Sequence, residues 1–179
     1  MLFFTSDLHF CHANIIKMCS RPFADVDEMN NTLIQNWNAV VGSRDEIYIL
    51  GDFLYKGNGS QAREILKKLR GKKYLIKGNH EKYLASSDFD VSLFESVKDY
   101  DVINYKDVRF ILFHYPILEW QYYHRKSVHL YGHIHKNTSQ IPEVSKKFSY
   151  LGKRAINVSV DVNDYYPISA EAVYARAFK

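Results

Sequence analysis

The stretch Leu2-Phe3-Phe4-Thr5-Ser6-Asp7-Leu8-His9 decides the fold, because it joins a short apolar run to a carboxylate and an imidazole. Residues 2–6 are apolar or β-prone and predict a first strand that is buried on both faces. Asp7 and His9 follow at the end of that strand. In an open α/β sheet, ligands bind beyond the carboxyl ends of the strands, so the stretch predicts a buried strand that delivers polar groups to a site.

The same arrangement recurs along the chain, since further polar residues follow short apolar runs and most have a glycine beside them. They are Asp52 after Gly51, Asn79 and His80 after Gly78, His114 after the run 110–113, and His133 and His135 after Gly132. Glycine permits tight turns and close approach of the backbone. We therefore expect these segments to converge on one site.

Strands and helices alternate in the first half of the chain. Residues 46–50 and 73–77 predict the second and third strands. Helices are expected over residues 12–19, from a cap at Asp27 to Val41, and from a cap at Ser60 to Gly71. Three strand–helix alternations in a row indicate right-handed βαβ units and a mainly parallel sheet.

The second half follows a different pattern. Residues 101–105 and 108–113 predict a β-hairpin, because two β-prone runs flank a tight turn. The remaining expected elements are a short strand over 128–131, a polar loop over 136–153, a strand over 155–162, and a closing helix capped by Ser169.

The length and composition narrow the class of protein. With 179 residues, the chain is expected to form one domain over residues 1–179. The net charge of +4 is weakly basic and does not by itself indicate a nucleic-acid partner. No apolar run approaches the roughly 20 residues of a membrane span, and the N-terminus lacks the pattern of a signal peptide. Cys11 and Cys19 lack CxxC spacing, which argues against a zinc–thiolate site and favours a reducing, cytoplasmic location.

The polar residues form a ligand set for metal ions. Imidazoles, carboxylates and an amide without thiolate suit Mn, Fe, Zn, Co or Ni, of which we prefer manganese. Seven ligands are too many for one ion, so with a bridging carboxylate they predict two ions about 3.5–4 Å apart. In an extended chain, residues two apart point the same way, which lets Asp7 and His9 reach one centre, and His133 and His135 the same or another. Two divalent ions outweigh the charge of the two aspartates, so the cavity is net positive and suits a phosphate oxyanion.

Each of these residues also has a plainer explanation. Asp52 and Asn79 are typical caps of the helices that follow them. His114 is compatible with a buried, hydrogen-bonded histidine, and His133 and His135 with surface histidines at a strand end. Only their joint occurrence at strand ends favours a metal site.

The chain resembles the calcineurin-like metallophosphoesterase superfamily through motifs that occur in series. These motifs are Asp7-Leu8-His9, Gly51-Asp52, Gly78-Asn79-His80-Glu81, His114 and Gly132-His133-Ile134-His135. Residues 8–16 and 161–169 also resemble a compact subfamily from bacteria and phages. The resemblance implies an α/β fold in which two packed mixed β-sheets are flanked by helices, a four-layer α-β-β-α sandwich.

The resemblance also implies a role for each ligand residue. One ion is held by Asp7, His9 and His135, the other by Asn79, His114 and His133, and Asp52 bridges them. A metal-bridging hydroxide then attacks phosphorus in line. His80 protonates the leaving oxygen or steadies the phosphate.

Two positions depart from the family pattern. Phosphoprotein phosphatases of this superfamily carry an acid three residues after the bridging aspartate and then an arginine, whereas this chain has Tyr55 and Lys56. The difference argues against a phosphoprotein phosphatase and leaves Glu81 or another group as the partner of His80. Cys11 replaces the glycine that the subfamily leads us to expect, either as an oxidation-sensitive thiol or as a small filler.

Three further features of the sequence each allow a functional and a purely structural interpretation. His12 either contacts the phosphate or leaving group beside the metals, helped by a helix N-terminus, or starts a helix without a role. Arg21 is a candidate anion clamp or an ordinary loop arginine. Residues 119–126 either stack a base and hold its phosphate or form a partly buried loop anchored by Trp120, which we favour.

The function predicted from these residues is two-metal hydrolysis of a phosphodiester or phosphomonoester, with a small nucleotide-type diester as the preferred substrate. The expected partner is this small ester, with no membrane; nucleic acid is possible but not favoured, and the sequence names no protein partner. A nuclease is an alternative, although no strong basic stripe supports one. A non-catalytic binding or scaffold module on the same fold is another, but it predicts lost ligands and every ligand position is filled.

Overall fold

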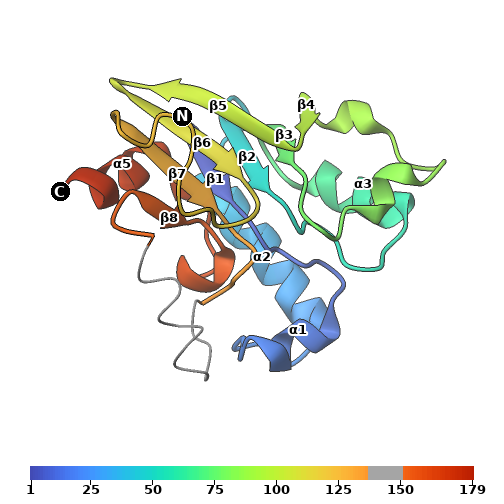
Figure 1. The fold of residues 1–179 in the computed structure, drawn as a ribbon. Helices are drawn as coiled ribbons and strands as arrows, with labels where there is room; N and C mark the ends of the chain where they lie inside the picture. The colour runs from blue at the N-terminus through green and yellow to red at the C-terminus, as the bar shows by residue number, and fades with distance from the viewer. Residues whose placement is uncertain (137–150) are drawn as a thin grey trace.

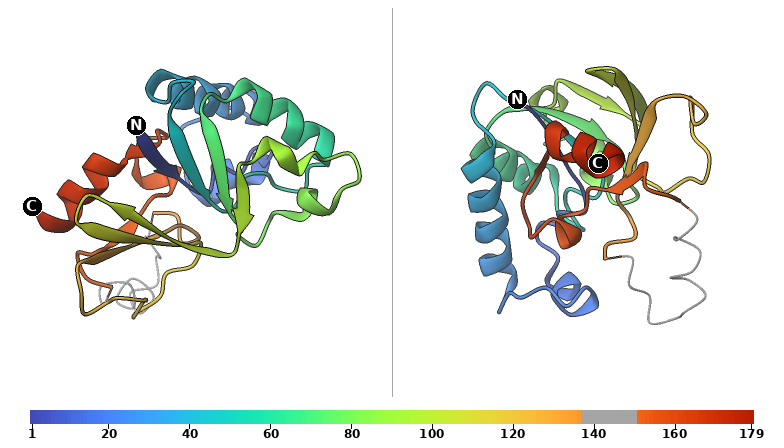
Figure 2. Two further views of the ribbon diagram at one scale, coloured as in Figure 1. Left: turned by 90° about the horizontal axis from the view of Figure 1, so that it is seen from above. Right: turned by 90° about the vertical axis from the view of Figure 1, so that its left-hand side faces the viewer.

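Two β-sheets packed face to face form the centre of the molecule, as a computed structural model shows for residues 1–136 and 151–179 (Figure 1). Seen from above, long helices cover one side of the first sheet and the second sheet lies on its other side (Figure 2). The predicted polar loop over residues 136–153 lies almost entirely outside the described residues.

The first sheet has five strands in the order β4-β3-β2-β1-β9. Their bounds are β1 Leu2–Thr5, β2 Glu46–Leu50, β3 Lys72–Ile76, β4 Ser96–Lys98 and β9 Ile168–Ser169. Strands β1 to β4 are parallel, and β9 pairs antiparallel with β1. The three predicted strands and their parallel arrangement are confirmed, whereas the short edge strands β4 and β9 were not expected.

The second sheet has four strands in the order β5-β6-β7-β8. Their bounds are β5 Tyr100–Tyr105, β6 Val108–Phe113, β7 Ser127–Tyr131 and β8 Ala155–Asn157. The predicted hairpin is confirmed as the antiparallel pair β5 and β6, while β6, β7 and β8 are parallel.

The strand predicted over residues 155–162 is wrong in its second half. Strand β8 ends at Asn157, and the 3-10 helix η3 occupies Val160–Val162. The backbone N–H of Val160 donates at 3.1 Å to the carbonyl of Ser6, which directly follows β1, so the chain crosses between the sheets at this point. Residues 158–161 are all buried, so the apolar–polar alternation of the sequence here reflects a crossing and a turn and not a half-buried strand.

The helices are α1 Ala13–Met18, α2 Val26–Val40, α3 Gly59–Lys68 and α5 Ala170–Phe178, with 3-10 helices at Lys82–Ala85 and Val91–Leu93. Ser169 caps α5 as predicted. The other two predicted caps are wrong, because Asp25 accepts from Glu28 at the start of α2 and Asn58 forms a capping box with Gln61 at the start of α3. Within the described residues, 1–136 and 151–179, no helix is long and apolar enough to cross a membrane.

Neighbouring residues of the central strands supply two hydrophobic clusters. Phe3 belongs to the cluster that also contains residues of α2 and α3, and Phe4 belongs to the cluster with residues of β6, β7 and α5. Successive side chains of a strand point to opposite faces, so β1 is buried on both sides as predicted. The α/β fold of two mixed sheets with flanking helices is therefore confirmed.

Candidate metal centre

Five parallel strands deliver the predicted ligand residues to one region. Asp7 follows β1, Asp52 follows β2, Asn79 and His80 follow β3, His114 follows β6, and His133 and His135 follow β7. The turns after β1 and β2 are joined by backbone hydrogen bonds, from Asp7 to Gly51 at 3.1 Å and from His9 to Asp52 at 2.9 Å. Two sheets therefore contribute to a single polar cluster at their carboxyl ends.

The backbone around the ligands is left-handed, contrary to the extended geometry expected for Asp7–His9 and His133–His135. Positive φ angles occur at five of the seven ligand residues: Asp7 55°, His9 51°, Asp52 55°, His133 70° and His135 47°. Residues other than glycine rarely adopt this region, and such residues cluster at functional sites. Tight turns, and not the pleat of a strand, aim these side chains.

Glycines allow the close approach that the sequence predicts. A Cβ on Gly132 would lie 2.5 Å from Oδ2 of Asp7, and a Cβ on Gly78 would lie 2.5 Å from Oδ1 of Asp52. Neither position has room for a side chain while the carboxylate stays in place.

Asp7, His9 and His135 form the first ligand group, since each offers a ligand atom within 4.8 Å of the other two. The carboxylate of Asp7 is fully buried and accepts from the backbone N–H of His133 at 2.9 Å. His9 is 2% exposed, yet neither of its ring nitrogens has a hydrogen-bond partner. A buried imidazole without a partner is costly unless something else binds its lone pair.

Asp52, His114 and His133 form the second ligand group, with the same limit of 4.8 Å between their ligand atoms. The side-chain oxygen of Asn79 lies 3.2 Å from Nε2 of His114 and 3.1 Å from Nδ1 of His133. On the other side of the His114 ring, Nδ1 lies 2.8 Å from the carbonyl of Leu50. That carbonyl fixes the proton on Nδ1 and leaves Nε2 free to bind a cation.

Asp52 lies between the two groups. Its Oδ2 is 3.5 Å from Nε2 of His9 and 3.6 Å from Nε2 of His114. Its Oδ1 accepts from the backbone N–H groups of Asn79 and His80, each at 3.1 Å. Asp52 therefore caps no following helix, which excludes the plainer explanation of this residue.

Electrostatics favour cations in this cluster. Burial, reinforced by the charge of Asp7, raises the pKa of Asp52 to about 7. Burial also lowers the pKa of His9 to about 2, with His135 as the next largest cause, so this ring is a neutral electron-pair donor. Divalent cations would relieve both the repulsion between the carboxylates and the unpartnered imidazole, so the donor set fits metal ions.

His80 lies at the edge of the cluster, where 32% of its side chain is exposed and Nε2 is 4.0 Å from Oδ2 of Asp52. The carboxylate of Glu81, which the sequence offered as a partner of His80, binds other groups. Its carboxylate accepts from the backbone N–H groups of Phe53 at 3.0 Å and Gly78 at 2.7 Å. Glu81 thereby ties together the backbones of the two turns that carry Asp52 and Asn79.

His12 is buried beside the cluster, and its ring stacks on Tyr55 at 3.6 Å between centroids. It occupies the N-cap position of α1 but makes no capping hydrogen bond, and its Nδ1 has no partner. Both rings line a hollow of about 310 Å³. The ring of Tyr55 also lies 5.0 Å from that of His80, so this hollow adjoins the metal-ligand cluster.

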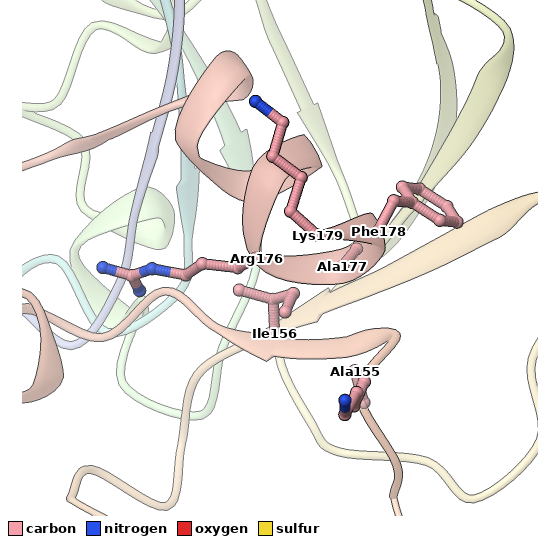
Figure 3. A pocket seen from close by; sticks show the side chains of 7 residues that line it. Ala155, Ile156, Arg176, Ala177, Phe178 and Lys179 are labelled. Carbon is pink, nitrogen blue, oxygen red and sulfur yellow. The ribbon is translucent and has the colours of Figure 1, made fainter.

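A wider hollow of about 620 Å³ lies away from the cluster, between β8 and the end of α5 (Figure 3). None of the predicted ligand residues lines it. The loop over residues 119–126 is anchored by Trp120, which is buried and donates to Oγ of Ser127 at 2.9 Å, as we favoured. Cys11 and Cys19 are both free thiols.

Asp161 is a site residue that sequence reasoning missed. Its Oδ2 lies 2.7 Å from Nδ1 of His135, and Arg21 binds both of its oxygens at 2.9 Å. Arg21 is buried against Asp161, so it is neither a clamp for a substrate anion nor an ordinary loop arginine. The only signal in the sequence was that the segment 161–169 matched the subfamily pattern.

Known proteins resemble this chain in sequence and in fold. A family model described as calcineurin-like phosphoesterase matches residues 2–108. The uncharacterized protein MJ1445 of Methanocaldococcus jannaschii is 38% identical over 96% of this chain and 88% of its own. The Gene 66 protein of Mycobacterium phage L5 is 38% identical over 44% of this chain and 38% of its own. The crystal structure of AQ665, a protein of unknown function from Aquifex aeolicus, superposes with a TM-score of 0.75 at 28% identity over 98% of each chain.

Proposed function

The chain belongs to the calcineurin-like phosphoesterase family, and from this premise we propose that it is a two-metal hydrolase of phosphate esters. The observation that carries the proposal is the pair of ligand groups joined by Asp52. Two groups that share one carboxylate match the donor requirement of two neighbouring divalent ions.

The residues would divide between two ions. The first ligand group would hold one ion, the second group with Asn79 would hold the other, and Asp52 would contribute to both. Divalent ions, with Mn²⁺ preferred among Mn, Fe, Zn, Co and Ni, would act as Lewis acids on phosphate oxygens and activate water. The protein fixes the orientation of the ligands through the Leu50 carbonyl and the backbone N–H groups around Asp52.

His80 is the proposed general acid. Its side chain is 32% exposed at the rim of the ligand cluster, where an ester oxygen would approach, and its Nε2 faces the shared carboxylate. Its backbone is held by Asp52, so the ring has a defined position without being a buried ligand. A histidine in this position can give a proton to the leaving oxygen.

His12 and Tyr55 are proposed to contact the organic part of the substrate. Their stacked rings line a hollow next to His80, with Lys56 and the amide of Gln61 on the same wall. Stacked rings beside a cation and an amide suit a planar, polar group. This favours a phosphate ester with a planar organic group, such as a nucleotide ester, and within that class a small phosphodiester is the proposed substrate.

The scaffold alternative requires a site that has lost its chemistry. The unpartnered nitrogens of buried His9 and the raised pKa of Asp52 argue against it. A site that no longer binds metal would be stabilised by replacing such groups. The nuclease alternative has no specific observation in its favour.

The test is metal content together with turnover of bis-p-nitrophenyl phosphate and p-nitrophenyl phosphate, with Mn²⁺ and after chelation. We expect two ions per chain, faster hydrolysis of the diester, and loss of hydrolysis on chelation. His80→Asn should lower turnover by about 10²- to 10⁴-fold while both ions remain bound.

The matched control is His124→Asn, since His124 is exposed and its Nε2 lies 3.0 Å from exposed Glu119, away from the ligand groups. It should leave metal content and turnover unchanged. Loss of an ion in His80→Asn would make His80 a ligand instead of an acid. A wild-type protein that neither takes up metal nor hydrolyses either ester would support the scaffold alternative.

A further inference from the structure

A buried ion pair lies directly behind the first ligand group. Nε of Arg21 donates to Oδ1 of Asp161 and Nη2 donates to Oδ2, both at 2.9 Å, and neither side chain is exposed. Two parallel bonds between a guanidinium and a carboxylate fix their mutual orientation. A pair so deeply buried is a costly feature to retain unless its geometry is used.

The pair contacts both parts of the first ligand group. Oδ2 of Asp161 lies 2.7 Å from Nδ1 of His135. On the other side, Arg21 donates to the carbonyl of Asp7 at 2.7 Å and to that of Leu8 at 3.0 Å. These contacts reach the left-handed turn that orients Asp7 and His9. They also reach His135, which lies 126 residues after His9 and completes the group.

Cys19, His135 and Asp161 also satisfy the distance limit for a metal site of their own. Arg21 decides against that interpretation. It occupies both oxygens of Asp161, and its positive charge would repel a second cation at this place. The cluster is therefore a support for His135 and not a separate metal site.

We propose that Asp161 and Arg21 are positioning residues for the metal in the first ligand group, an inference that rests on the proposed function of that group. Asp161 keeps the proton on Nδ1 of His135, which presents Nε2 to the ion together with Asp7 and His9. Arg21 holds Asp161 in place and pins the carbonyls of the Asp7 turn. Outer partners of this kind set the orientation and affinity of metal ligands.

The experiment compares Mn²⁺ binding by wild type and Asp161→Asn, using calorimetric titration of the chelated proteins. The substitution preserves shape and removes the carboxylate. We expect one of the two sites to lose between about 10-fold and 100-fold in affinity while the other is unchanged, and turnover to recover in excess Mn²⁺. Asp164→Asn is the matched control, because Asp164 is exposed and three residues away.

A spectroscopic readout separates positioning from general structure. In the zinc-loaded protein, nitrogen-15 NMR should show His135 protonated at Nδ1 with a downfield, slowly exchanging proton. Asp161→Asn should move that signal upfield and speed its exchange, because a neutral amide is a weaker acceptor than a carboxylate. If Asp161→Asn does not fold, Arg21→Gln/Asp161→Asn removes both buried charges together and replaces it in the same titration.

Wild-type affinity at both sites, or an unchanged Nδ1 signal, in the folded variant would overturn the proposal. That result differs from failure of the proposed function, in which wild type itself would bind no pair of ions and hydrolyse no ester.

Discussion

The first ligand group is held from behind by a buried ion pair, whereas the second is held by backbone groups and by the side chain of Asn79. Asp7 and His9 are buried, and Asp161 supports His135 from the core. His133 is exposed, and its Nδ1 lies 3.1 Å from the oxygen of Asn79. The first group lies in the interior except for half-buried His135, and the second is equally buried at Asp52 and His114 but opens to solvent at His133.

This difference indicates that the two ligand groups depend on the fold to different degrees. The interior group depends on contacts from the far end of the chain, so its geometry is linked to the stability of the fold. The open group depends on local turns, and a substrate would approach on its side. A change in the first group should therefore affect folding and metal binding together, and a change in the second should affect metal binding alone.

The largest expected effect comes from Asp52, which belongs to both halves. Asp52→Asn keeps an oxygen for the N–H groups of Asn79 and His80 but removes the shared charge. Loss of an outer partner alone costs about 10- to 100-fold, so turnover should fall by more than about 100-fold and at least one ion should be lost. Metal analysis and diester hydrolysis measure this.

Asp164→Asn is again the control, because Asp164 has a φ of 52° against 55° for Asp52 but is exposed. Equal activity of Asp52→Asn and this control would show that the two halves do not share a ligand.

The next effect should separate the halves. His133→Asn removes the imidazole of the open group, and asparagine tolerates the left-handed backbone at this position. The backbone N–H of residue 133 still donates to Asp7, so the first group should keep its ion. We expect one ion per chain, little turnover, and a free energy of unfolding within about 0.5 kcal/mol of wild type after chelation. Loss of both ions would show that the halves are not independent.

The smallest effect on chemistry but the clearest on folding should come from Arg21→Met. It leaves the buried carboxylate of Asp161 without its cation, and removing one member of a buried pair costs about 3–5 kcal/mol. Urea unfolding of the chelated protein measures this, with exposed Arg44→Met as the control. A loss below about 1 kcal/mol would remove the distinction between the two halves.

Much of the architecture was predictable because its signals are local. The apolar runs before Asp7, Asp52 and His114 predicted strands β1, β2 and β6, and glycines marked the turns where the backbone passes close to a carboxylate. Helix caps were less certain, since several polar residues precede each helix. Asp25 and Asn58, two residues before the predicted caps, are the ones whose side chains reach the first turn.

The sequence by itself predicted which residues form the two candidate ligand groups, because each stands next to its own strand and turn, but it did not predict Asp161 behind them. Residue spacing left open how they are grouped, and the tertiary structure decided it. His133 and His135, two residues apart, join the different groups that the family resemblance implied, because left-handed turns rotate their side chains. The tertiary structure also paired Arg21 with Asp161, which lies 140 residues away. A buried ion pair forms only where the fold brings both charges together away from water, and no local sequence pattern predicts such a long-range contact.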